Sequence, residues 1–215
     1  MNAGYNLGNY GLRIRTIIDV GVLYGTDWLY AAFPRADILL IDPLPEVHDV
    51  PARYPRRTIK CAQYAAGSQP GKHRLQLIRK PDGSLDGRTG LLTRTPLTKV
   101  EIYDHMTVKV DTVDRIIRRH KCHPPYLLKI DTEGFEARVL LGARSTLADT
   151  ECVIAEVPTK RRFNQGPRAS RLFSILGRAG FELFKVLGGN GPRNNYYDMM
   201  FVKFSHKMFD KTFER

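Results

Sequence analysis

Residues 16–25 constrain the fold of this chain more than any other part of the sequence. They form a β-branched apolar run that ends in Asp-x-Gly-x-x-x-Gly, with Gly21 and Gly25 as the two glycines. A second apolar run, residues 38–41, ends in Asp42, 21 positions after Gly21. A strand that leads into a glycine loop, followed by a strand that ends in an acid, is typical of a doubly wound α/β sheet that binds a nucleoside.

The first loop favours S-adenosylmethionine over a dinucleotide as the ligand. A dinucleotide site uses Gly-x-Gly-x-x-Gly, whose amide groups meet a pyrophosphate at a helix N-terminus. Here the middle glycine is missing and Asp19 precedes the loop. An acid at this position suits a ligand that has no phosphate and carries an amino acid on a sulfonium. We therefore expect S-adenosylmethionine, with Asp42 on its ribose hydroxyls.

Composition narrows the class of protein. With 215 residues, 42% of them hydrophobic and 26% charged, the chain is expected to fold as one domain with a substantial core. Its net charge of +12 favours anionic partners: nucleic acid, acidic glycans, phosphorylated small molecules or membrane surfaces. The three cysteines form no Cys-x-x-Cys pair, and neither a signal peptide nor a membrane span is visible. We expect reduced thiols and a cytoplasmic location.

The order of elements predicts a mostly parallel sheet. An N-terminal arm at residues 1–15 precedes a single domain at 16–215, with a loop-rich insertion around 67–106. Strand and helix patterns alternate through most of the domain, which is typical of right-handed crossovers between parallel strands.

The C-terminal half adds two specific expectations. The pattern predicts one helix from Phe135 to about Leu147. The last two strands, 181–187 and 199–204, are joined by a loop without room for a helix, so they should pair antiparallel. We therefore predict a Rossmann-like class I methyltransferase sheet, mostly parallel, with one antiparallel strand near the C-terminus.

In such a sheet, ligands bind at the carboxyl ends of the strands. Asp131 and Glu133 follow a buried apolar strand, and Gly134 permits a tight turn into the next helix. These two acids are suited to holding the amine of the cofactor, accepting a hydroxyl proton or binding a divalent metal. The alternative is that Asp131 caps the helix and Glu133 complements its dipole. The first-loop motif favours the functional interpretation.

Several motifs together match one known family. They are Ile18-Asp19-Val20-Gly21 with Gly25, Asp42-Pro43-x-Pro45, Lys129-Ile130-Asp131-x-Glu133-Gly134-Phe135-Glu136, Ala155-Glu156-Val157, Gly180-Phe181 and Asp198. From about residue 16 to 204, the chain resembles the FkbM-type family of S-adenosylmethionine-dependent methyltransferases. It departs from the Gly-Ala-Asn-x-Gly loop of that family at Val22 and Leu23, and Asp42 is shorter than the more usual glutamate.

The resemblance implies methyl transfer to a hydroxyl of a sugar, a polyketide or another small metabolite. The residues expected to bind the cofactor are Asp19, Gly21, Gly25, Asp42, Ala65, Ala66, Asp131 and Glu133. For the base that takes the hydroxyl proton, we expect Asp131 first and Glu156 second. No ligand motif supports a metal ion, although the acids are compatible with a divalent one. Surface or structural roles are assigned to the lone histidines His48, His105 and His123.

Basic residues fall in several loops expected at the same edge of the sheet. We expect Arg161, Arg162 and Arg193 to bind the substrate, as part of a cationic collar for an anionic molecule. The alternative is that a basic chain simply carries arginines over its whole surface. The collar hypothesis predicts that neutralising Arg161 and Arg162 weakens substrate binding and leaves cofactor affinity unchanged.

Two other functions stay open at this point. An RNA methyltransferase would use the positive charge, and Tyr196 and Tyr197 would stack on bases. Against it, Pro124-Pro125-Tyr126 lacks the polar residue that opens the Pro-Pro-aromatic motif of base methyltransferases, and it precedes its strand. The other function is that of an inactive cofactor-fold protein that binds a partner, for which the altered first loop is the only support.

Overall fold

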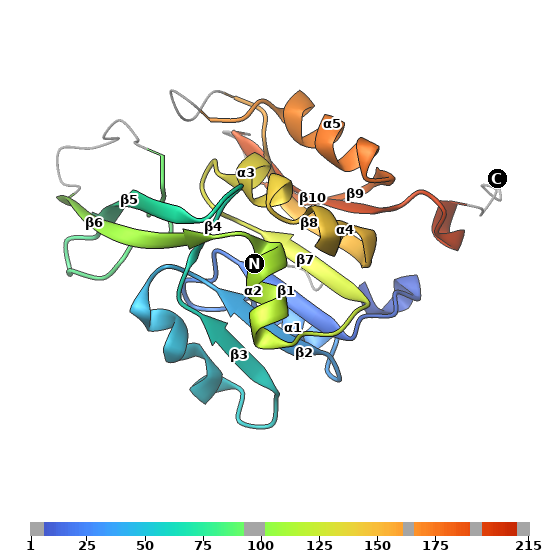
Figure 1. Cartoon of the computed structure of the whole chain (residues 1–215), viewed down its shortest axis with the longest axis horizontal. Helices are drawn as coiled ribbons and strands as arrows, with labels where there is room; N and C mark the ends of the chain where they lie inside the picture. The colour runs from blue at the N-terminus through green and yellow to red at the C-terminus, as the bar shows by residue number, and fades with distance from the viewer. Residues whose placement is uncertain (1–6, 93–101, 161–165, 190–194, 210–215) are drawn as a thin grey trace.

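A computed structural model gives the chain a seven-stranded sheet with helices on both faces (Figure 1). The structure describes residues 7–92, 102–160, 166–189 and 195–209. The strands of the sheet are β1 (Thr16–Val20), β2 (Asp37–Ile41), β3 (Ile59–Ala62), β7 (Tyr126–Ile130), β8 (Thr150–Pro158), β9 (Phe181–Gly189) and β10 (Tyr196–Lys203). Their order is β3-β2-β1-β7-β8-β10-β9, and β10 runs antiparallel to both of its neighbours. The expected sheet, mostly parallel with one antiparallel strand near the C-terminus, is confirmed.

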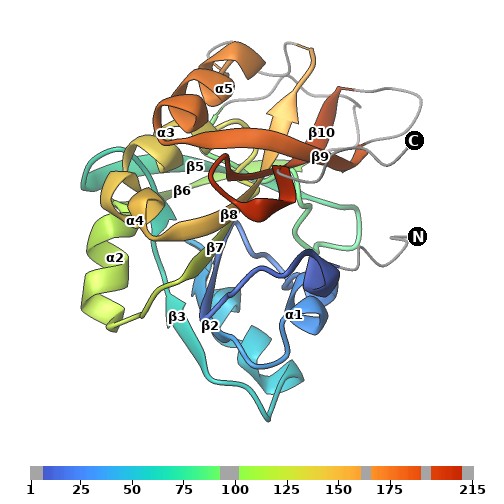
Figure 2. The ribbon, with the colours of Figure 1, turned by 90° about the vertical axis from the view of Figure 1, so that its right-hand side faces the viewer.

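The helices separate into two layers (Figure 2). Those of the chain's described part are α1 (Asp27–Ala32), α2 (Val113–His120), α3 (Glu136–Leu141), α4 (Arg144–Ala148) and α5 (Ala169–Arg178), with 3-10 turns η1 (Leu7–Tyr10), η2 (Pro45–His48), η3 (Val50–Arg53) and η5 (Lys207–Phe209). Helices α2 to α5 cover one face, where Ile18 and Leu128 are buried, and α1 covers the other face above Ile17 and Leu127. None of these helices has both the length and the apolar character that crossing a bilayer requires.

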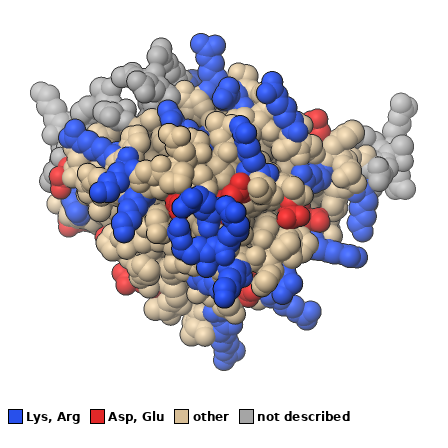
Figure 3. All heavy atoms as spheres, viewed as in Figure 1, with Lys and Arg blue, Asp and Glu red and all other residues tan. Residues whose placement is uncertain are grey.

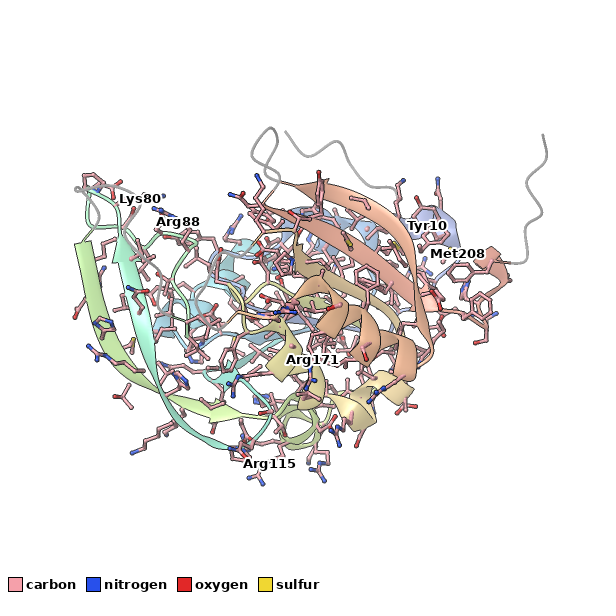
Figure 4. The ribbon with its side chains drawn as sticks, turned by 90° about the horizontal axis from the view of Figure 1, so that it is seen from above. Tyr10, Lys80, Arg88, Arg115, Arg171 and Met208 are labelled. Atoms are coloured by element: carbon pink, nitrogen blue, oxygen red, sulfur yellow. The ribbon has the colours of Figure 1, made fainter. Side chains whose placement is uncertain are left out.

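The insertion contains more regular structure than the sequence pattern suggests. Strands β5 (Gly71–Arg79) and β6 (Ile102–Asp111) form a long antiparallel pair that extends away from the main sheet in Figure 1, and β4 (Ala65–Ala66) pairs with β6. Leu75, Val108 and Phe135 share a small core of their own. The segment that leaves β5 carries Lys80 and Arg88 far from the helical layers (Figure 4). This pair of strands forms a wall beside the carboxyl ends of the main sheet.

The single helix expected from Phe135 to Leu147 is wrong, because two short helices, α3 and α4, occupy this stretch. The break falls at Gly142, whose backbone packs so closely on the insertion that a Cβ there would lie 2.0 Å from the carbonyl oxygen of Gly67. Asp114, from α2, then caps α4 by accepting hydrogen bonds from the backbone N–H of Thr146 (2.8 Å) and its neighbour. Both causes are contacts between distant parts of the chain, which a local pattern does not reveal.

Candidate functional site

The first loop brings the ends of β1 and β7 together. Gly21 has φ +77°, and a Cβ at this position would lie 1.8 Å from the backbone oxygen of Asp131. The end of β1 approaches the segment after β7 so closely that only glycine fits at this position. Two residues later, Leu23 adopts φ +46°, a left-handed conformation that asparagine accepts more readily than leucine. The asparagine that the family carries at this position therefore has a backbone reason as well as a side-chain one.

Asp42, expected on the ribose, also holds the first loop in place. Its Oδ2 accepts hydrogen bonds from the backbone N–H of Val22 (2.9 Å) and Leu23 (3.1 Å), and its Oδ1 accepts one from Leu44 (2.9 Å). Burial raises the pKa of this carboxyl, and the three N–H groups oppose that effect. A carboxylate has about four acceptor positions, so roughly one is left for a ligand hydroxyl.

Asp19 lies beneath the site, with a side chain that is completely buried. Its Oδ2 accepts a hydrogen bond of 2.5 Å from the Tyr30 hydroxyl, and its Oδ1 lies 3.2 Å from Lys129 Nζ. Lys129 Nζ also donates to the backbone oxygen of Gly21 (3.3 Å) and lies 3.6 Å from Asp131 Oδ2. Burial opposes the charge of Lys129, but the carboxylates of Asp19 and Asp131 outweigh it and raise the pKa of the ammonium. Asp19 thus acts on the site through Lys129.

A cavity of about 650 Å³ opens above these residues. Most of the residues expected to bind the cofactor line it: Gly21, Gly25, Asp42, Ala65, Ala66 and Asp131. One wall comes from the insertion, through Thr89, Gly90 and Leu91, and another from Trp28 at the start of α1. The volume is within the usual range for a site that encloses one small organic molecule.

Three acids meet where β7 and β8 end. Asp131, Glu133 and Glu156 each present a carboxylate oxygen, and these oxygens lie within 4.8 Å of one another. The alternative role for Asp131, capping α3, is not observed, because the N-cap position is Phe135 and, among the described residues, no side chain caps this helix. Glu136 Oε1 instead accepts hydrogen bonds from the backbone N–H of Thr132 and Gly134, in the turn before α3. Burial raises the pKa of Glu136 to about 7. The acids alone are insufficient grounds for a metal, and none is assigned to them.

A second cavity of about 740 Å³ lies on the other side of these acids. Glu156, which is 5% exposed, and Glu136 line it, together with Met199 from β10. The same cavity is lined by Lys160, Arg168 and Phe173. It therefore combines buried carboxyl groups, two cationic side chains and one aromatic ring.

Several arginines of the loops near this edge are bound to other groups of the protein. Arg53 binds the Asp27 carboxylate (3.0 Å), Arg57 donates to three backbone oxygens around the end of α1, and Arg88 pairs with Asp86 (2.8 Å). The expected substrate residues Arg161, Arg162 and Arg193 lie outside the described residues. Figure 3 shows Lys and Arg side chains distributed over the whole visible face. Positive charge is thus spread over this face, and among the described residues Lys160 and Arg168 line the second cavity.

Sequence reasoning did not select Asp198 as a site residue, although it lines the first cavity. Asp198 lies near the beginning of β10, opposite Glu156 of β8. An antiparallel strand begins at the edge where its parallel neighbours end, so its first residues reach the same rim. The predicted reversal of the last strand was therefore the signal that identifies this acid.

We expect an Asp42→Ala variant to bind S-adenosylmethionine about 10- to 100-fold more weakly, because hydrogen bonds to a charged acceptor are lost from the loop. Calorimetric titration measures the change. The affinity of Asp42→Asn, which keeps one acceptor oxygen, should lie between those of Asp42→Ala and the native chain. Asp49 is an exposed acid near η2, so Asp49→Ala should bind S-adenosylmethionine with the native affinity. Equal affinities for Asp42→Ala and the native chain would contradict the role given to this carboxylate.

Comparisons with known proteins agree with this geometry. A family model, "Methyltransferase FkbM domain", matches residues 19–183. Among solved structures, the chain is similar to a methyltransferase FkbM from Methylobacillus flagellatus KT, with 15% identity and a TM-score of 0.55, over 89% of this chain and 44% of that one. It is also similar to magnesium protoporphyrin IX methyltransferase (ChlM) from Synechocystis PCC 6803 with bound S-adenosylmethionine, with 12% identity and a TM-score of 0.50, over 93% and 74% of the two chains. No curated protein matches.

These likenesses to solved structures concern the fold. At 15% and 12% identity they carry no information about the molecule that is methylated. The chain spans less than half the length of the first of the two proteins. The family model, by contrast, covers most of the present sequence and includes the first loop, Asp42 and the acids after β7.

Proposed function

Because the chain belongs to the FkbM family of methyltransferases, which use S-adenosylmethionine, we propose that it methylates a hydroxyl group of an anionic small molecule, such as an acidic sugar. The observation that carries this proposal is the acidic edge formed by the three carboxylate oxygens within 4.8 Å at the ends of β7 and β8 and by Asp198, which lies opposite Glu156. A hydroxyl must lose its proton during or after attack on the methyl group, and a carboxylate nearby is suited to take it.

The first cavity suits the cofactor in its size and in the residues that line it. S-adenosylmethionine supplies a methyl group on a positively charged sulfur. At one end of the cavity, Ala65 and Ala66 offer a small apolar surface beside Asp42, as an adenosine requires. At the other end, Asp131 and Asp198 offer negative charge toward the cationic methionine part. Lys129 and the first loop hold this acidic end in position.

The second cavity supports an anionic acceptor. Lys160 and Arg168 line it together with Glu156, one of the three acids. An acceptor in this cavity would place an acidic group on the cations and a hydroxyl toward the carboxylates. Arginine binds carboxylates and phosphates through paired hydrogen bonds, which fixes the orientation of such a group.

The RNA alternative has less support at this site. Tyr197, proposed to stack on a base, has its ring against the backbone of Gly189, where a Cβ would lie 2.7 Å from the ring. The end of β7 carries Asp131 and Glu133 in place of the Pro-Pro-aromatic motif typical of base methyltransferases. Both features disfavour a nucleobase as the acceptor.

The proposal is tested by supplying the protein with S-adenosylmethionine labelled in its methyl group. Hydroxylated carboxylates and sugar phosphates are offered as acceptors, each beside its uncharged counterpart, and an RNA pool is offered in parallel. We expect label on an oxygen of an anionic small molecule, identified by mass spectrometry and NMR. Label on RNA, or equal transfer to charged and uncharged acceptors, would contradict the proposal.

For an acceptor found in this way, we expect Arg168→Gln to raise KM at least about tenfold, because a charge-assisted hydrogen bond is lost. The dissociation constant of S-adenosylmethionine should stay the same. Arg171→Gln is the matched control, because Arg171 is an exposed arginine in the first turn of α5, directly after Arg168, and does not line the second cavity (Figure 4). Steady-state kinetics and calorimetry give the two constants, and an unchanged KM would exclude this cavity as the acceptor site.

A further inference from the structure

Asp198 occupies a position that the known motifs leave without a role. It lines the first cavity from β10, beside β8, and its partner in the strand register is Glu156. On the other side of β10, the pairing with β9 is interrupted by a register shift between Asp198 and Met199. Irregularities of this kind re-aim side chains and are frequent beside active sites.

The neighbouring acids are less suited to accept a proton. Asp131 Oδ2 lies 3.6 Å from the ammonium of Lys129, so this carboxylate is already engaged in an ion pair. Glu156 lines the second cavity rather than the first. Among the described residues, Asp198 is joined to no cation by a salt bridge, and Lys129 acts on it only as a nearby charge.

The charges around Asp198 come from two strands. Burial and the negative charge of Asp131, directly after β7, raise the pKa of Asp198 to about 6, against the opposing effect of the positive charge of Lys129 on β7. From β8, Glu156 faces it across the strand pair, and β9 contributes Gly188, which does not titrate. A carboxyl with a pKa close to neutrality is mostly ionised at pH 7 and still takes up a proton efficiently.

We propose that Asp198 faces the sulfonium of bound S-adenosylmethionine and receives the proton of the acceptor hydroxyl. This inference rests on the proposed function. The hydroxyl oxygen forms a bond to the methyl carbon, the bond between that carbon and sulfur breaks, and its electron pair stays on sulfur. The hydroxyl proton passes to the Asp198 carboxylate. One positive and one negative charge are thereby neutralised, and Asp198 later returns its proton to water.

A binding measurement tests this placement without any acceptor. S-adenosylmethionine and S-adenosylhomocysteine share the adenosine and the amino acid, but only the first carries the sulfonium charge. If Asp198 faces that charge, its ionisation strengthens the binding of S-adenosylmethionine alone. Asp198 is protonated below pH 6 and ionised above it, so the affinity for S-adenosylmethionine relative to S-adenosylhomocysteine should rise about tenfold from pH 5 to pH 8.

Calorimetry with both ligands, on the native chain and two variants, gives the result. In Asp198→Asn the ratio of the two affinities should be independent of pH, and S-adenosylhomocysteine should still bind. In Asp131→Asn the ratio of the two affinities should still rise with pH, but with its midpoint at lower pH. The negative charge of Asp131, which adds to the effect of burial on the pKa of Asp198, is absent from this variant.

Two results would overturn the inference while both ligands bind. If the ratio of the two affinities rises with pH in Asp198→Asn as it does in the native chain, another group is responsible for the pH dependence. A pH dependence that is equal for the two ligands would place Asp198 beside a part that they share. Absence of binding by either ligand would instead overturn the proposed function together with this inference.

Discussion

Replacing Lys129 with methionine is expected to lower the free energy of unfolding by about 3–5 kcal/mol, because the change leaves the charge of Asp19 buried without its cation. The Asp19 side chain is completely buried, and Lys129 Nζ lies 3.2 Å from its Oδ1 as a charge contact rather than an aligned hydrogen bond. Of its two oxygens, Oδ2 would keep the Tyr30 hydroxyl. Urea unfolding measures the loss, and the melting temperature should fall on the order of 10 °C.

The matched control for Lys129→Met is the double variant that also carries Asp19→Asn. Removing both charges should restore much of the stability lost in the single variant, because the buried anion is gone as well. The coupling between the two changes then measures the ion pair itself. A loss below about 1 kcal/mol in Lys129→Met would show that the pair is not the support that we assign to it.

A Gly21→Ala variant is expected to lose the folded site altogether. The new Cβ would lie 1.8 Å from the Asp131 carbonyl oxygen, which only a separation of β1 from the segment after β7 relieves. The backbone also has φ +77°, where alanine costs on the order of 1 kcal/mol. We expect insoluble protein or a loss of stability above about 4 kcal/mol, with no binding of S-adenosylmethionine. Circular dichroism and calorimetry measure the two effects.

Gly83→Ala is the control for Gly21→Ala. Gly83 has nearly the same conformation, φ +82°, but a Cβ there meets nothing within 4 Å. Its substitution should therefore cost only the backbone strain, on the order of 1 kcal/mol. Similar losses in the two variants would mean that the contact between Gly21 and Asp131 does not govern the stability of the first loop.

The sequence predicted the sheet well because its central strands β1, β2 and β7 are buried on both sides and read as continuous apolar runs. The reversal of the last strand followed from a loop too short to contain a helix, and the structure confirms it. The break between α3 and α4 could not be predicted in this way, since it arises where Gly142 meets the backbone of Gly67. The insertion likewise owes its long strands to pairing across a distance in sequence.

The candidate site was predictable in its position and less so in its detail. The rule that ligands bind at the carboxyl ends of parallel strands brought Gly21, Asp42, Ala65 and Asp131 to one cavity. Two details depend on side-chain orientation, which the spacing of residues in the sequence does not determine. They are the hydrogen bonds from the first loop to Asp42 and the burial of Asp19. The lone histidines at positions 48, 105 and 123 are exposed and line neither cavity, in line with the surface roles expected for them.

The measurement that tests the account most directly is calorimetric titration of S-adenosylmethionine into the native chain, with the emission of Trp28 followed in parallel. Trp28 is the only tryptophan of the sequence, and it lines the first cavity. We predict one binding site with a micromolar dissociation constant and a saturable change in emission over the same concentrations. A titration without heat and without a change in emission would contradict the assignment of this cavity to the cofactor.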